Sequence, residues 1–117
     1  MRFSVLRAAR ITGWFLTVLI ILLSLVPPWL RPESGAPHNL EHLAIFVVTG
    51  FTFGFAYNRS PALAMVALVT FAGAIEIAQL FVPGRHARLS DFIVDALSLC
   101  IGVAVGFVTA RTLLQSA

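Results

Sequence analysis

Four apolar runs separated by short polar breaks fill this 117-residue chain and constrain its fold more than any other feature. A membrane-spanning helix needs about 20 predominantly apolar residues, and the runs with their polar ends cover approximately residues 11–30, 39–57, 61–82 and 91–110. Hydrophobic residues make up 59% of the chain and charged residues only 11%, against about 25% charged in a typical soluble domain. These features predict an all-α membrane protein with a single domain over residues 1–117. We expect a four-helix transmembrane bundle with short loops and antiparallel neighbours throughout, which leaves no length for a soluble catalytic domain.

The first run follows a basic stretch, as the apolar part of a signal peptide does. Arg2, Arg7 and Arg10 precede it. A cleavable signal would end in a small-x-small site, whereas this run leads into Val26-Pro27-Pro28-Trp29. Because proline ends a helix and tryptophan suits the membrane interface, we predict an uncleaved first span.

The eight arginines predict the orientation of the spans, because positively charged segments tend to stay on the cytoplasmic side. A cytoplasmic N-terminus puts five arginines inside, namely Arg2, Arg7, Arg10, Arg59 and Arg111, and leaves three outside, namely Arg31, Arg85 and Arg88. We therefore expect a multi-pass protein with both termini in the cytoplasm. The arginines are too scattered for a nucleic-acid-binding face, so no nucleic-acid partner is expected.

Polar side chains interrupt the ends of the third and fourth runs. Glu76 and Gln79 lie in the third run and Asp95 lies in the fourth. A charged group at the centre of a membrane helix costs about 2.5–3.5 kcal/mol on insertion scales, so each carboxylate indicates a functional site or a buried pair. Counted at about 1.5 Å per residue, His42, Glu76 and Asp95 are expected at similar depth near the outer surface.

The segment between these two runs carries the charges that could partner the carboxylates. Arg85 and Arg88 follow the Pro83-Gly84 break, and Ser90-Asp91 is a helix-start signal. The helix dipole favours Asp91 in a first turn but disfavours Glu76 near a helix C-terminus. Glu76 therefore needs a partner. Arg85 or Arg88, in a bidentate pair, is the natural candidate, and a protonated His42 is the second.

Helical phase places the polar residues of the fourth run on one narrow stripe. At 100° per residue the stripe contains Asp91, Asp95, Ser98, Gly102 and Gly106. Its two glycines have the spacing that lets membrane helices approach closely, so we predict that the stripe faces another helix of the bundle. A Gly102→Leu change should then be strongly destabilising and Gly102→Ala much milder. A comparable stripe on the second run contains His42, Phe46, Thr49, Phe53 and Tyr57.

The order of these polar residues resembles the VanZ-like family of small bacterial integral membrane proteins. The resemblance rests on Glu76-x-x-Gln79, Pro83-x-Arg85 and Asp91-x-x-x-Asp95, and it extends over roughly residues 37–106. The family pattern usually ends in Asn where this chain has Asp95, and of an Asp-Lys-x-x-His element only His42 is kept, with Glu41 as a stand-in acid. The resemblance implies a protein of the bacterial inner (cytoplasmic) membrane and cell envelope, connected with susceptibility to the glycopeptide teicoplanin.

Several chemistries remain open for this polar site, whose candidate residues are His42, Glu76, Gln79, Arg85, Arg88, Asp91 and Asp95. The arginines suit an anionic headgroup, such as that of a lipid-linked precursor. Alternatively, Glu76 and Asp95 could serve acid–base catalysis on a lipid-linked or cell-wall precursor at the outer leaflet, with His42 carrying protons. A third possibility is a scaffold whose polar residues only fix helix packing.

A metal is the weakest of these hypotheses. His42, Glu76, Asp91 and Asp95 form an oxygen-rich set that would suit Mg, Mn or Zn, but they lack a short ligand-spacing motif. No cofactor is expected. Membrane lipids and a lipid-linked precursor or anionic headgroup are the expected partners. The single Cys100 has no partner for a disulfide and is interpreted as a small buried side chain.

Overall fold

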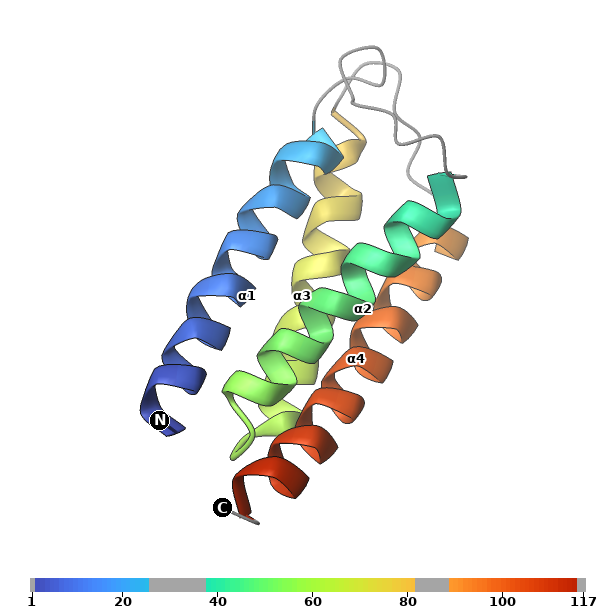
Figure 1. Ribbon diagram of the computed structural model, residues 1–117. Coiled ribbons are helices and arrows are strands. Elements are labelled where there is room, and N and C mark those ends of the chain that lie inside the picture. Colours follow the sequence, from blue (N-terminus) through green and yellow to red (C-terminus); the bar gives the residue numbers. More distant parts are fainter. Residues whose placement is uncertain (1, 26–37, 82–88, 116–117) are drawn as a thin grey trace.

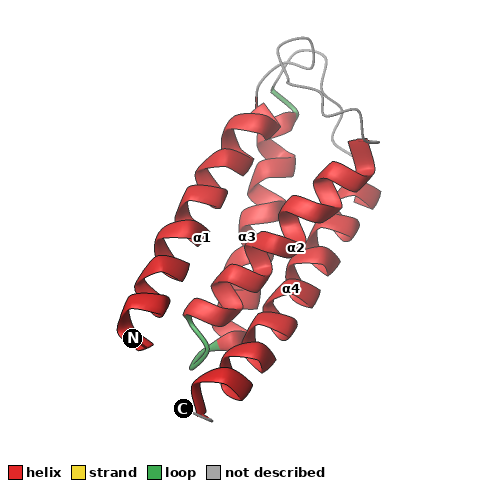
Figure 2. Ribbon diagram, in the orientation of Figure 1, coloured by secondary structure: helices red, strands yellow, loops and turns green. Residues whose placement is uncertain are grey.

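A computed structural model describes residues 2–25, 38–81 and 89–115 of the protein as a bundle of helices (Figure 1). The helices are α1 (Arg2–Leu25), α2 (His38–Ala56), α3 (Pro61–Gln79) and α4 (Leu89–Gln115). Helices, the turn at residues 57–60 and two turn residues after α3, 80–81, account for the described residues, without a strand among them (Figure 2). The predicted all-α membrane fold is confirmed.

Three helices have the length and composition of membrane spans, over Phe3–Leu25, Pro61–Gln79 and Phe92–Leu114. Large apolar side chains such as Phe15, Leu63 and Ile101 are exposed on them, as expected of helices that face lipid. The apolar part of α2 is shorter, Leu43–Ala56. At 1.5 Å per residue it extends about 21 Å, less than the roughly 30 Å of a bilayer core. The polar first turns of α2 therefore lie within the depth of the bilayer core.

Successive helices alternate in direction, which gives the bundle two distinct ends (Figure 1). We call one of them the turn end: α1 and α3 begin there, α2 and α4 finish there, and both ends of the chain lie there. We call the opposite end the loop end, where α1 and α3 finish and α2 and α4 begin. Residues 57–60 make the turn from α2 to α3. Pro61 opens the helix, and Ser60 is the N-cap residue without a side-chain capping bond.

The closest helix contact joins α2 and α4, which run parallel (Figure 1). A Cβ atom built on Gly102 would collide with the Val47 carbonyl oxygen and lie 2.7 Å from the Phe51 amide nitrogen. The predicted stripe on α4 therefore faces another helix of the bundle. The expectation of antiparallel neighbours throughout is wrong for this pair. Glycines on both helices let the two backbones come into contact. As a result, α2 packs more closely against α4 than against α1 or α3, its neighbours in sequence.

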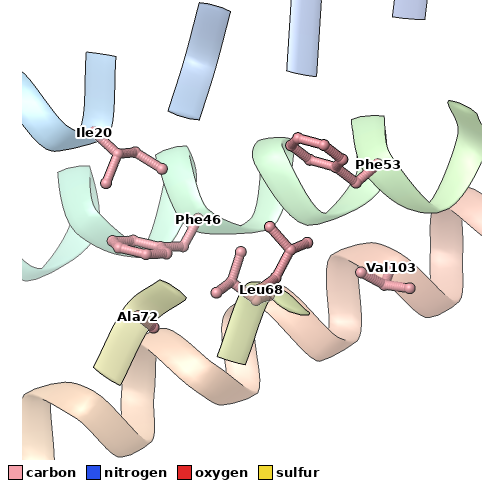
Figure 3. Close-up of a cluster of buried hydrophobic side chains, with 7 residues drawn as sticks. Ile20, Phe46, Phe53, Leu68, Ala72 and Val103 are labelled. Atoms are coloured by element: carbon pink, nitrogen blue, oxygen red, sulfur yellow. The ribbon is translucent and has the colours of Figure 1, made fainter. Parts of the chain in front are cut away.

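Buried side chains from all four helices meet around α2 (Figure 3). Phe46 and Phe53 of α2 are buried between Ile20 of α1, Leu68 of α3 and Val103 of α4. Because α2 makes the most extensive contacts of the four helices, chiefly with α4 and then with α1, it is the central element of the bundle. Its small and aromatic residues fill the interior rather than facing lipid.

Candidate functional site

The end of α3 is tied to the end of α1 by a hydrogen bond at the loop end. The Gln79 side-chain nitrogen Nε2 donates to the Ser24 carbonyl oxygen at 3.1 Å, and both residues are buried. In a continuous helix that carbonyl would accept from the amide of residue 28, which is Pro28 and has no N–H. The Gln79 side chain therefore donates the hydrogen bond that Pro28 cannot donate.

Glu76 lies in the last turn of α3, on a face of the helix that is partly buried. Its residue is half-buried, and the Oε2 atom is shielded from solvent. The next residues leave the helix, because the Leu80 and Phe81 amides bond to the Ile77 and Ala78 carbonyl oxygens, both at 3.1 Å. The carboxylate thus sits in the last helical turn, where the negative end of the helix dipole makes a cation or a proton favourable.

Asp95 is deeply buried in the α4 stripe that faces α2. It is 4% exposed, and Ser98, one turn further along, is 1% exposed. Gly50 packs against Leu99, and Gly102 packs between Val47 and Phe51. Carried back along the parallel helices, this register sets Asp95 level with about residues 42–46 of α2, a stretch that begins with His42.

The contact between α3 and α4 relates the two carboxylates. A Cβ atom on Gly73 would lie 3.4 Å from the ring of Phe92. Glu76 is three residues closer to the loop end than Gly73, and Asp95 is three residues further from it than Phe92. Their backbones therefore differ in depth by about 9 Å. The Cα–Cβ bonds tilt toward the N-terminus of each helix, so the two side chains lean toward one another.

The remaining candidates are placed only in part. His42 belongs to the first turns of α2 and Asp91 to the first turn of α4, and their side chains lie outside the described part of the molecule. Arg85 and Arg88 fall within residues 82–88, which are also outside it. The Glu76–Arg85 pair and the depth of the His42 side chain therefore stay predictions, whereas the backbones of Glu76 and Asp95 differ in depth by about 9 Å instead of sharing one level.

A metal centre is likewise untested. Among the side chains that the structure describes, no three His, Cys, Asp or Glu residues form a group that could hold a metal ion. Two members of the hypothetical ligand set, His42 and Asp91, are not among those side chains. The two carboxylates in view, Glu76 and Asp95, are oxygen donors of the kind that hard cations accept.

Sequence reasoning missed one contributor at the loop end, Ser24, and two glycines in the contact between α2 and α4. Ser24 takes part through its carbonyl oxygen, and its own side chain gave no signal. The Pro27-Pro28 pair could have revealed it, because two prolines leave two preceding helical carbonyls without their usual donors. Gly50 and Gly54 of α2 were also missed, although their spacing matches that of Gly102 and Gly106.

Comparison with protein families gives one match that covers nearly the whole chain. The family model described as VanZ/LLP1 matches residues 6–111. No curated protein and no solved structure matches the sequence. The matched range includes all four helices apart from the outermost residues of α1 and α4, and it contains both polar stripes and the glycine contact.

Proposed function

Because the chain belongs to the VanZ/LLP1 family, we propose that it is a cell-envelope protein of the bacterial inner membrane whose loop end recognises an anionic headgroup. The headgroup chemistry we favour is the phosphate of a lipid-linked cell-wall precursor. By holding such precursors the protein would modulate susceptibility to glycopeptides such as teicoplanin. Both termini would lie in the cytoplasm and the loop end would face outward.

The observation that carries this proposal is the burial of carboxylates beside a segment rich in arginine. Asp95 is 4% exposed and Glu76 has a shielded oxygen, within apolar helices that flank the segment holding Arg85 and Arg88. A carboxylate at such depth is costly unless a cation or a hydrogen-bond network compensates. Carboxylates of this kind can orient arginines, and an oriented guanidinium fork fits a phosphate bidentately.

The local architecture supports access to this end from the membrane. The apolar part of α2 is short, so the polar first turns of α2 lie within the depth of the bilayer core, just below the lipid headgroups. The first turn of α4 adds amide groups that have no acceptor within the helix, together with the positive end of the helix dipole, and both favour an anion. The Gln79–Ser24 bond fixes the ends of α1 and α3 relative to one another.

The test compares two changes at Arg85 in purified protein. Arg85→Lys should keep most of the thermal stability, because it keeps the charge, but should lose the co-purifying lipid-linked precursor, because lysine lacks the planar fork. Mass spectrometry of the lipid bound to wild type, Arg85→Lys and Arg85→Gln measures this. Arg111→Gln removes an arginine from the opposite end of the bundle and is the matched control.

Retention of the same lipid-linked precursor by Arg85→Lys and Arg85→Gln would contradict headgroup recognition and leave the polar end with a packing role. The enzyme hypothesis predicts a different result, namely that a bound precursor is converted during incubation. Conversion that depends on Glu76 and Asp95 would favour acid–base chemistry at the outer leaflet over recognition alone.

A further inference from the structure

A second site candidate lies at the turn end, opposite to the polar residues of the loop end. A cavity of about 1290 Å³ opens there between α1 and α3, with the end of α2 as its floor. Pockets for drug-sized ligands typically have about 300–1,000 Å³, so this one suits a larger molecule. It lies entirely within described residues, and the family motifs do not contribute to it.

The inner wall of the cavity is apolar and its rim is basic. Phe53, Leu68 and Phe71 line the interior, and three arginines, Arg7, Arg10 and Arg59, line the rim. Among the described residues that line it, none is acidic. Apolar walls below a cluster of cations match the two parts of an anionic lipid, which are the acyl chains and the phosphate.

Aromatic contacts hold part of the rim in place. The Trp14 indole nitrogen Nε1 donates a hydrogen bond to the Tyr57 hydroxyl oxygen at 3.2 Å. The guanidinium carbon of Arg10 lies 5.0 Å from the centroid of the Tyr57 ring, and the Trp14 ring meets Phe53 edge to face at 5.4 Å between centroids. These contacts join α1 to the end of α2 and fix one arginine without neutralising it.

Charge is distributed unevenly between the two ends of the molecule. All five acidic residues occupy positions 33–95, and those in the described helices lie in the first turns of α2 and α4 or the last turns of α3, toward the loop end. The turn end carries five arginines, of which three line the cavity. The described residues at the turn end therefore offer no anion to these arginines, so an anion bound by them would come from outside the described chain. Tryptophan and tyrosine are typical of the membrane interface, where lipid phosphates lie.

We propose that this cavity binds an anionic glycerophospholipid, with its phosphate at Arg7, Arg10 and Arg59 and its acyl chains against Phe53, Leu68 and Phe71. The site is independent of the headgroup site at the loop end, since the two lie at opposite ends of the bundle. Binding would hold α1 against α3, between which the cavity opens.

Fluorescence of Trp14 tests the proposal directly, because this side chain lines the cavity. Trp29→Phe leaves Trp14 as the only tryptophan of the chain. The protein is reconstituted in phosphatidylcholine vesicles that contain increasing fractions of bromine-labelled phosphatidylglycerol or bromine-labelled phosphatidylcholine. We expect the anionic lipid to quench Trp14 at a several-fold lower fraction. Arg7→Gln and Arg59→Gln should each reduce that preference about fivefold, since one arginine near an anionic headgroup has an effect of about this size.

Arg111→Gln is the matched control, because Arg111 also lies at the turn end but stacks on Phe107 outside the cavity. It should change the preference less than twofold. Equal quenching by the two lipids in the Trp29→Phe protein would overturn the proposal without any arginine variant. A loss of preference in Arg111→Gln as large as in Arg59→Gln would also overturn it, since the effect would then reflect net charge and not the cavity.

Discussion

Gln79 shows how a single polar side chain can replace a hydrogen bond that proline removes. Pro28 cannot donate to the Ser24 carbonyl oxygen, and water is scarce at the end of a membrane helix. The Gln79 amide fills that position from α3, at 3.1 Å. The glutamine is thus explained as a link between helix ends, and this role is compatible with a neighbouring binding site.

Removing this donor should weaken the bundle. We expect Gln79→Ala to lower the free energy of unfolding in detergent by about 0.6–1.7 kcal/mol, the range of single interhelical hydrogen bonds in membrane proteins. Thr70→Ala is the control, because the Thr70 hydroxyl donates only to the Val66 carbonyl oxygen of its own helix and is exposed. Equal effects of the two substitutions would mean that the link to α1 adds nothing to stability.

Glu76 and Arg85 allow a second test at this scale. If they pair, removal of one partner leaves the other charge buried, at a cost of about 3–5 kcal/mol. Replacing both should cost less than the sum of the single changes. A double-mutant cycle with Glu76→Gln and Arg85→Gln, measured by thermal unfolding in detergent, should show a coupling of at least about 1 kcal/mol. Additive effects would refute the pair.

At the scale of elements, the contact between α2 and α4 depends on four glycines that each face a carbonyl oxygen. Cβ atoms on Gly50 and Gly54 would meet the Leu99 and Val103 oxygens, and those on Gly102 and Gly106 would meet the oxygens of Val47 and Phe51. These atoms are backbone, which cannot move aside without separating the helices. Even one methyl group has no room at Gly102, so Gly102→Ala, although expected to be much milder than Gly102→Leu, should still destabilise the bundle.

We expect Gly102→Ala to lower the free energy of unfolding by about 1–3 kcal/mol, as overpacked sites do. Gly73→Ala is the matched control in another helix. Its Cβ would meet only the Phe92 ring, at 3.4 Å, an ordinary contact, and alanine favours a helix over glycine by up to about 1 kcal/mol. Unfolding in detergent followed by circular dichroism measures both. Stability of Gly102→Ala equal to or above that of Gly73→Ala would contradict the close approach.

Sequence periodicity could predict which face of α4 is buried but not which helix covers it. The phase of Ser98, Gly102 and Gly106 follows from local geometry alone. The choice of α2 as partner follows from contacts between residues about 50 positions apart, which no local pattern encodes. The same reason hid the cavity, because Trp14 and Tyr57 are joined only in the folded bundle. Buried polar residues were recognisable because an apolar run makes any interruption visible.

At the scale of the whole molecule, the bundle is electrically polar. The turn end carries Arg2, Arg7, Arg10, Arg59 and Arg111 and, among its described residues, no acid. The acids of the described helices lie toward the opposite end. The fold thus brings five of the eight arginines together at one end of the bundle. Such an excess of arginine on one side is typical of the cytoplasmic face of a membrane protein.

This polarity leads to a prediction about topology that labelling can check. Cys100 is first replaced by serine so that new cysteines stand alone. A cysteine at Ser34 should react with a membrane-impermeant maleimide on intact cells. One at Ser60, which is exposed in the turn between α2 and α3, should react only after permeabilisation, because that turn belongs to the arginine-rich end. A reporter fused after Ala117 should be active in the cytoplasm.

The reverse labelling pattern would place the arginine-lined cavity outside and the polar residues of the loop end inside. The positive-inside argument for this chain would then be wrong, and a precursor on the outer leaflet could not reach Arg85.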